Sequence, residues 1–143
     1  MEKNKSITDL SNVFSSYPEI LPNNNQIAYI DSLEFETIGN LWIYDLEKEE
    51  NIQKTKFDYD QTDTVKVVKW LDEQNILVII GFCYGTVTQG GSLYRYNLND
   101  ETLELLIESE KSMEFKDINI VGDKVILSKV IWKDDNYMEY DIQ

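Results

Sequence analysis

A glycine-led segment that occurs twice is the feature that most restricts how this chain can fold. The first copy spans residues 39–46 (GNLWIYDL) and the second spans residues 91–98 (GSLYRYNL), so the copies start 52 residues apart, from 39 to 91. In both, a turn glycine leads into alternating apolar and aromatic residues, a pattern typical of a β-strand. A third copy, without the glycine, lies at residues 136–142. Spacings of this size match one four-stranded unit, so the chain is predicted to be a repetitive all-β protein.

Further strands are expected around each copy. A short run rich in β-branched residues precedes each one, at residues 26–30, 75–80 and 124–128. Another strand is predicted before each of these runs, at residues 17–21, 65–71 and 115–121. Outer strands are expected at residues 51–55 and 102–107. The sequence therefore predicts three blade-like antiparallel sheets, formed by residues 17–57, 64–110 and 114–143.

The two ends of the chain carry separate expectations. The third unit stops at Gln143, before an outer strand could form, which would leave an unpaired sheet edge. Residues 1–16 are expected to form an N-terminal arm. This arm reads equally well as an edge strand through residues 6–10 or as a short helix through residues 10–16. Residues 17–143 are interpreted as a single β domain.

The motifs resemble a known repeat. The segment LPNNNQIAYI at residues 21–30, followed after a gap by residues 39–46, is similar to the TolB-type β-propeller repeat. The chain also resembles small uncharacterised domains of low-GC Gram-positive bacteria that have no assigned activity. This resemblance implies a propeller-like fold of about three blades, whereas closed propellers have four to eight. The assembly would then be open, or it would close when two chains form a homodimer with a six-bladed ring.

Charge excludes one class of partner. The 27 acidic residues outnumber the 13 basic ones, giving a formal net charge of −14, which repels a phosphate backbone. Direct binding to nucleic acid is therefore not expected. A basic partner protein remains compatible with this charge.

The residue types that are missing exclude several chemistries. The chain has no histidine and a single cysteine, Cys83, which lies in an apolar run and is expected to be buried. Histidine-based triads and the common Cys/His zinc sites therefore cannot form. The glycines match neither a dinucleotide-binding nor a P-loop spacing. We expect no cofactor and no enzymatic activity, with paired carboxylates as the remaining device for a hydrolase.

Candidate binding residues lie in two predicted hairpin tips, at residues 32–38 and 82–90. These loops occupy corresponding places in the first two units and contain apolar and aromatic residues. Loops on one face of a repeat protein often bind partners. The residues chosen on this basis are Phe35, Phe82, Tyr84 and Gln89. The alternative is that both tips cap the core or contact a second subunit.

A weak cation site is the remaining candidate. Asp58, Asp60 and Asp63 stand at alternating and nearby positions, as at the start of a calcium loop. However, Asp63 occupies the position where that loop has its glycine, and Lys69 occupies the twelfth position in place of glutamate. A solvated loop is therefore the preferred interpretation.

No apolar stretch in the sequence is long enough to span a membrane. The chain is expected to be cytoplasmic, unless an N-terminal anchor has been removed ahead of Met1, in which case it would lie outside the cell or on its surface. The leading hypothesis is a non-enzymatic module that binds a protein or a small ligand. The alternative is an acidic inhibitor or immunity-type protein that masks a basic site on its partner.

Overall fold

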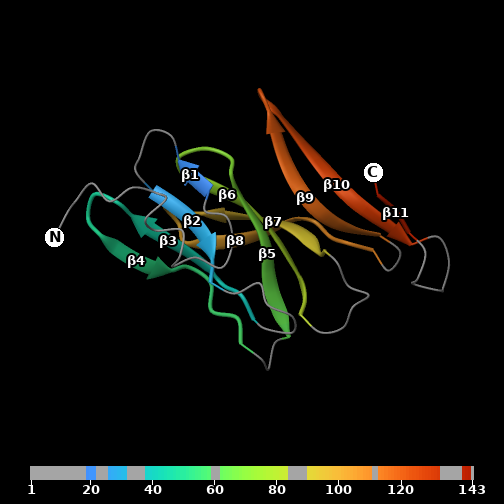
Figure 1. Cartoon of the computed structure of the whole chain (residues 1–143), viewed down its shortest axis with the longest axis horizontal. Helices are drawn as coiled ribbons and strands as arrows, with labels where there is room; N and C mark the ends of the chain where they lie inside the picture. Colours follow the sequence, from blue (N-terminus) through green and yellow to red (C-terminus); the bar gives the residue numbers. More distant parts are fainter. Residues whose placement is uncertain are drawn as a thin grey trace.

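Three antiparallel sheets make up the part of the chain that the structure describes (Figure 1). The computed structural model describes residues 19–21, 26–31, 38–58, 62–83, 90–110, 113–132 and 140–142. Every regular element within these residues is a strand, as the alternating sequence predicts. The predicted all-β, propeller-like fold is therefore confirmed.

The strands follow the chain within each sheet. The first sheet has the order β1 (Glu19–Leu21), β2 (Gln26–Ile30), β3 (Leu41–Asp45) and β4 (Glu50–Gln53). The second sheet has the order β5 (Asp63–Trp70), β6 (Asn75–Phe82), β7 (Ser92–Asn97) and β8 (Thr102–Ile107). The third sheet contains β9 (Met113–Val121), β10 (Lys124–Trp132) and β11 (Tyr140–Ile142), with β10 in the middle.

Within the described residues, the third sheet ends at β11 and has no counterpart of β4 or β8, the outer strands of the other two sheets. Its long β9–β10 hairpin projects away from the first two sheets (Figure 1). The predicted N-terminal arm lies outside the described residues.

The second sheet forms the centre of the fold because β6 is buried on both of its faces. Ile76, Val78 and Ile80 pack in the cluster shared with the first sheet, which includes Ile30 and Leu41. On the opposite face of β6, the side chains of the intervening residues pack against Phe115 and Ile118 of the third sheet; these residues are Leu77 and Ile79. A strand covered on both faces needs a continuous apolar run, which explains the sequence ILVII at residues 76–80.

Backbone hydrogen bonds join neighbouring sheets at the two glycines of the sequence motif. The Val65 amide at the start of the second sheet donates to the Gly39 carbonyl at 3.0 Å. Phe115 in the third sheet and Gly91 donate to each other's carbonyl oxygens at 2.9 and 3.0 Å. The glycine before β3 and the glycine before β7 therefore anchor the first strand segment of the following sheet.

The second of these junctions requires glycine for steric reasons. A Cβ atom built on Gly90 would lie 2.0 Å from the Phe115 carbonyl oxygen, and one built on Gly91 would lie 2.1 Å from the Ile80 carbonyl oxygen. Both neighbours are backbone atoms and cannot rotate away. The consecutive glycines thus allow the backbone just before β7 to lie close to the backbones of β6 in the second sheet and β9 in the third.

The outer hairpins of the first two sheets use the same turn chemistry. The Asp45 side chain accepts hydrogen bonds from the amides of Glu47 and Lys48, and the Asn97 side chain accepts one from the Asp100 amide. Each turn then places a glutamate in the left-handed region, Glu49 with φ 55° and Glu101 with φ 54°. Short polar side chains that bind nearby amides are typical of such turns.

Candidate functional site

Only one of the predicted hairpin-tip residues lies within the described part of the chain. Phe82 ends β6, and its side chain is 44% exposed. It pairs in register with Asp63, the first residue of β5. The other three predicted binding residues, Phe35, Tyr84 and Gln89, lie outside the described residues, so the proposed hairpin-tip face stays a prediction. Cys83, next to Phe82, is buried and forms no disulfide, as expected.

The candidate cation ligands do not form a cluster among the residues described. Asp58 and Asp63 are both exposed, and Asp60 falls outside the described ranges. Across those ranges, no group of three or more acidic or cysteine side chains is arranged to hold a metal ion.

Among the described residues, exposed large apolar side chains form two groups, one on the outer strand β8 and one at the tip of the β9–β10 hairpin, with Val121, Val125 and Ile126. All six residues of β8 are exposed. Four of them are large aliphatic residues with 36–46% of their surface accessible: Leu103, Leu105, Leu106 and Ile107. We call these four residues the β8 surface. Single exposed aliphatic residues are ordinary, but a contiguous group on one strand is typical of an interaction site.

The corresponding outer strand of the first sheet has a different composition. Asn51 of β4 pairs with Tyr44, as Leu103 of β8 pairs with Tyr96. In the same way, Gln53 pairs with Trp42, and Leu105 pairs with Tyr94. Polar residues at these positions of β4 support an outer strand, so strand formation alone does not require the leucines of β8.

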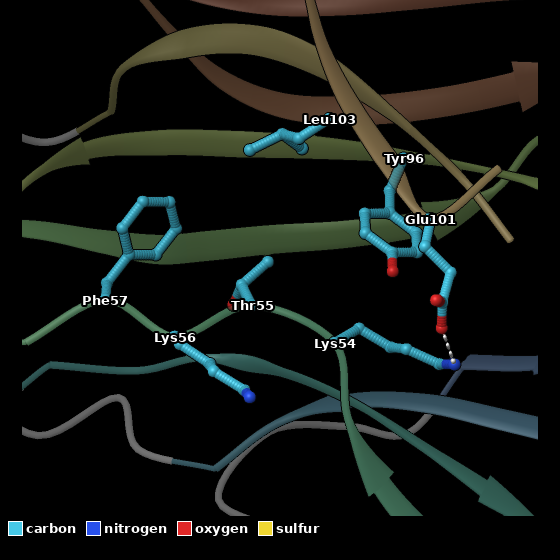
Figure 2. Close-up of a pocket in the computed structure, with 7 residues that line it drawn as sticks. All are labelled: Lys54, Thr55, Lys56, Phe57, Tyr96, Glu101 and Leu103. Atoms are coloured by element: carbon cyan, nitrogen blue, oxygen red, sulfur yellow. Dashed lines mark ion pairs between the residues drawn. The ribbon is translucent and has the colours of Figure 1, made fainter.

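A groove of about 270 Å³ opens at the Leu103 end of β8 (Figure 2). One wall is the chain that follows β4, with Thr55 and Phe57, and the other wall is formed by Tyr96 of β7 and Leu103. Figure 2 shows Lys56 extending away from Tyr96 and Leu103. Aromatic and aliphatic side chains therefore line the interior of the groove, and charged side chains lie at its edges.

An ion pair closes one end of the groove. Lys54 Nζ lies 3.6 Å from Glu101 Oε1, and the Lys54 side chain is only 14% exposed. Burial, and to a smaller extent the charge of Glu101, raises the pKa of the nearby Tyr96 hydroxyl, which is therefore neutral at physiological pH. The pair joins the chain after β4 to the turn between β7 and β8.

A buried polar network holds the chain that forms the first wall. Asn40 Oδ1 accepts hydrogen bonds from Thr55 Oγ1 at 2.8 Å and from the Phe57 amide at 2.7 Å. Asn40 Nδ2 donates to the Phe57 carbonyl at 3.0 Å, and the Leu41 amide donates to Thr55 Oγ1 at 2.9 Å. Both side chains are buried, so these bonds replace lost contacts with water and give the wall one conformation.

Acidic residues flank the β8 surface on both sides along the chain. Residues 96–110 contain five carboxylates and no lysine or arginine: Asp100, Glu101, Glu104, Glu108 and Glu110. Glu104 pairs with Arg95 of the neighbouring strand β7, whereas Glu108 and Glu110 belong to the exposed segment after β8. Glu101 is likewise paired with Lys54, so the surface is apolar in its centre and has its unpaired negative charge mainly at the end that carries Glu108 and Glu110, beyond Ile107.

Sequence reasoning predicted the strand β8 with the correct bounds but did not identify its surface. The pattern TLELLI reads as a strand of which one face is buried, and nothing local shows that both faces stay open. A comparison of residues 102–107 with residues 50–55 one unit earlier would have revealed the excess of leucine.

These features define an open, propeller-like all-β domain of three sheets with an apolar outer strand. The chain belongs to the DUF4652 family, described as a domain of unknown function, whose model matches residues 30–142. A search for relatives among curated proteins found no match.

Two solved structures are similar to this chain. A protein from Clostridium novyi NT, described as a "putative conserved lipoprotein", is similar over 100% of this chain and 89% of its own, with 25% identity and a TM-score of 0.80. TolB from Acinetobacter baumannii is similar over 91% of this chain but only 29% of its own, with 13% identity and a TM-score of 0.57. The second likeness concerns the fold alone, and this chain corresponds to a part of that propeller.

Within the described part of the chain, no helix is long and apolar enough to cross a membrane.

Proposed function

We propose that this domain is a non-enzymatic protein-binding module and that it contacts its partner through the β8 surface. The observation that carries this proposal is the difference between two outer strands in corresponding positions. β4 places Asn51 and Gln53 where β8 places Leu103 and Leu105. Because an apolar side chain gains free energy when it leaves water, the leucines favour a state in which another molecule covers them.

The groove adds a second element to this surface. It lies beside Leu103, and its walls include Phe57 and Tyr96. Recesses with aromatic walls next to an apolar strip accept anchoring side chains in many protein interfaces. We expect a bulky apolar side chain of the partner to enter it.

The acidic flanks favour a basic partner, which also supports an inhibitor or immunity-type protein as the second candidate function. In this role the domain would cover a basic site on its target. Binding would weaken steeply as salt is added, because exposed charge pairs are screened beyond a Debye length of about 8 Å at physiological ionic strength.

The location that we propose is the outer face of the cell. The Clostridium novyi protein, which is similar over the whole of this chain, is described as a lipoprotein. That description supports the surface location over the cytoplasmic one. Fractionation of cells that naturally make the protein, followed by immunoblotting of intact and protease-shaved cells, tests this point. Loss of the signal on shaving is expected, and full protection would contradict a surface location.

Site-specific photo-crosslinking tests the binding function. A benzoylphenylalanine placed at Leu106 is expected to capture a protein in cells that naturally make this domain, and the same group at Glu47, an exposed turn residue, serves as the control. The captured protein is then purified and titrated against wild type and the variant L103N/L105Q. An affinity at least about tenfold lower for the variant is expected, equivalent to about 1.4 kcal/mol. Equal affinities would contradict binding through β8.

A further inference from the structure

The backbone of β8, and not only its side chains, is available to a partner. β8 pairs with β7 on one side, and no strand among the described residues pairs with its other side. Exposure of all six residues agrees with this position at the edge of the sheet. An edge strand presents a row of N–H and C=O groups that can hydrogen-bond to another strand.

β8 also lacks the features that usually prevent such pairing. Natural edge strands are shielded by lysine, by proline or by very short length. β8 has six residues, contains neither lysine nor proline, and has a single charged residue, Glu104, which pairs with Arg95. The corresponding strand β4 is shorter, with four residues, and begins with the charged residue Glu50. Among the described strands, β4 is therefore short and charged at its start, whereas β8 is longer and has no residue that would prevent pairing at its outer edge.

The two faces of β8 differ in chemistry. Leu103 and Leu105 lie on the face that carries Tyr96 and Tyr94 of β7, whereas Glu104, between them, lies on the opposite face with Arg95. An added strand would thus place aliphatic side chains beside the leucines. Its alternate residues would lie beside Glu104 and close to the acidic residues that flank the strand.

We infer that β8 is a strand-addition site for an extended partner segment in which lysine or arginine alternates with aliphatic residues. This inference rests on the proposed function and specifies how the partner is bound. Backbone hydrogen bonds to the open edge supply the pairing, the leucines select aliphatic residues, and the negative flanks select basic ones. The net charge of −14 disfavours a second copy of this chain as the occupant.

A synthetic peptide tests the inference. The probe is the acetylated, amidated and fluorescein-labelled peptide Lys-Val-Lys-Val-Lys-Val-Lys, titrated by fluorescence anisotropy at two salt concentrations. Binding is expected for wild type, with at least about tenfold weaker binding for L103N/L105Q. I52N, which removes an exposed aliphatic residue from β4, is the matched control and should bind as wild type does. Circular dichroism establishes that each variant is folded.

Two further measurements separate strand addition from simple charge attraction. A peptide of the same sequence with N-methylated valines keeps its charge but cannot pair through those amides, and it is expected to lose binding. Hydrogen exchange is expected to show new protection confined to residues 102–107 when the unmodified peptide is bound. Equal binding of the methylated peptide, or no protection in β8, would overturn the inference.

Affinity and hydrogen-exchange measurements with the natural partner distinguish strand addition from the broader proposal of binding through the β8 surface. A partner whose affinity falls in L103N/L105Q, but which gives no amide protection in β8, would overturn strand addition and leave the proposed function standing. A partner whose affinity is unchanged in that variant would contradict both.

Discussion

Leu103 and Asn51 occupy corresponding positions on the outer strands of neighbouring sheets, opposite Tyr96 and Tyr44 respectively. Both residues pair with a tyrosine of the neighbouring strand, but Asn51 is polar and Leu103 is apolar. Because a polar residue such as Asn51 is compatible with an outer strand at this position, strand formation does not require the leucine at position 103.

Replacement of the leucines by the β4 residues should therefore leave the fold intact. We expect L103N/L105Q to lower the free energy of unfolding by no more than about 1 kcal/mol, since both side chains are partly exposed and surface changes are usually small. Urea denaturation followed by tryptophan fluorescence measures this change. A loss of more than about 3 kcal/mol would instead assign these leucines to the core.

The buried network around Asn40 should contribute far more. We expect Asn40→Ala to lower the free energy of unfolding by about 3 kcal/mol, because the Thr55 hydroxyl and the Phe57 backbone amide would each lose the acceptor of their hydrogen bond while still buried or half-buried. Asn99→Ala, in an exposed turn, is the matched control and should change stability by less than about 0.5 kcal/mol. Similar effects of the two substitutions would show that the network contributes little.

The left-handed turn at Glu49 offers a stabilising substitution. A non-glycine residue at φ 55° is strained, so Glu49→Gly should raise the free energy of unfolding by about 0.5 to 1 kcal/mol. Glu47→Gly, in the same turn, gains no such relief and should lower it, because glycine makes the unfolded chain more flexible. Thermal unfolding of both variants measures the difference, and destabilisation of equal size in both would contradict this account.

Asp72 should make stability depend on pH in the acidic range. Burial raises the pKa of its carboxyl, but hydrogen bonds from Gln74 and Asn75 outweigh this effect and lower it below the ordinary value of 3.8. A carboxyl whose pKa is lowered in the folded state stabilises the protein above its unfolded pKa, and that contribution is lost as the pH falls through the folded pKa. The stability difference between wild type and Asp72→Asn should therefore be largest near neutral pH and shrink below about pH 4. A difference that stays constant down to pH 2.5 would show that the charge of Asp72 is not involved. The side chain is largely exposed, so the effect should be small.

The face of the first sheet that points away from the second sheet argues against closure into a six-bladed ring. Ile27 and Tyr29 alternate with the residues that face the second sheet, yet their exposure in the single chain is only 0% and 4%. A second copy would therefore find this face already covered. We expect a monomer of about 16.8 kDa by light scattering at low and high salt. A stable dimer at both salt concentrations would contradict this expectation.

The amino-acid sequence by itself determined the elements of this fold. The alternation of apolar residues and the turn residues between them indicate where the strands lie, and residues 26–30 and 102–107 were predicted as strands with the bounds that the structure shows. Other bounds differ: the strand predicted at residues 124–128 continues to Trp132 as β10, and the one predicted at residues 51–55 ends at Gln53 as β4. The apolar run at residues 76–80 likewise indicated an inner, well-buried strand, as β6 is. The exclusion of histidine chemistry follows from composition alone.

Only the tertiary structure decided which apolar residues stay exposed. Leu77 and Leu105 both stand in apolar strands, but Leu77 packs against Phe115 and Ile118 of the third sheet, whereas Leu105, on an outer strand, is 46% exposed. Burial depends on neighbours that are distant in the sequence, so local patterns cannot assign it. The groove likewise joins Thr55 and Phe57 to Tyr96 and Leu103 across about 40 residues of chain, from 55 to 96, a contact that only the packing of the first two sheets creates.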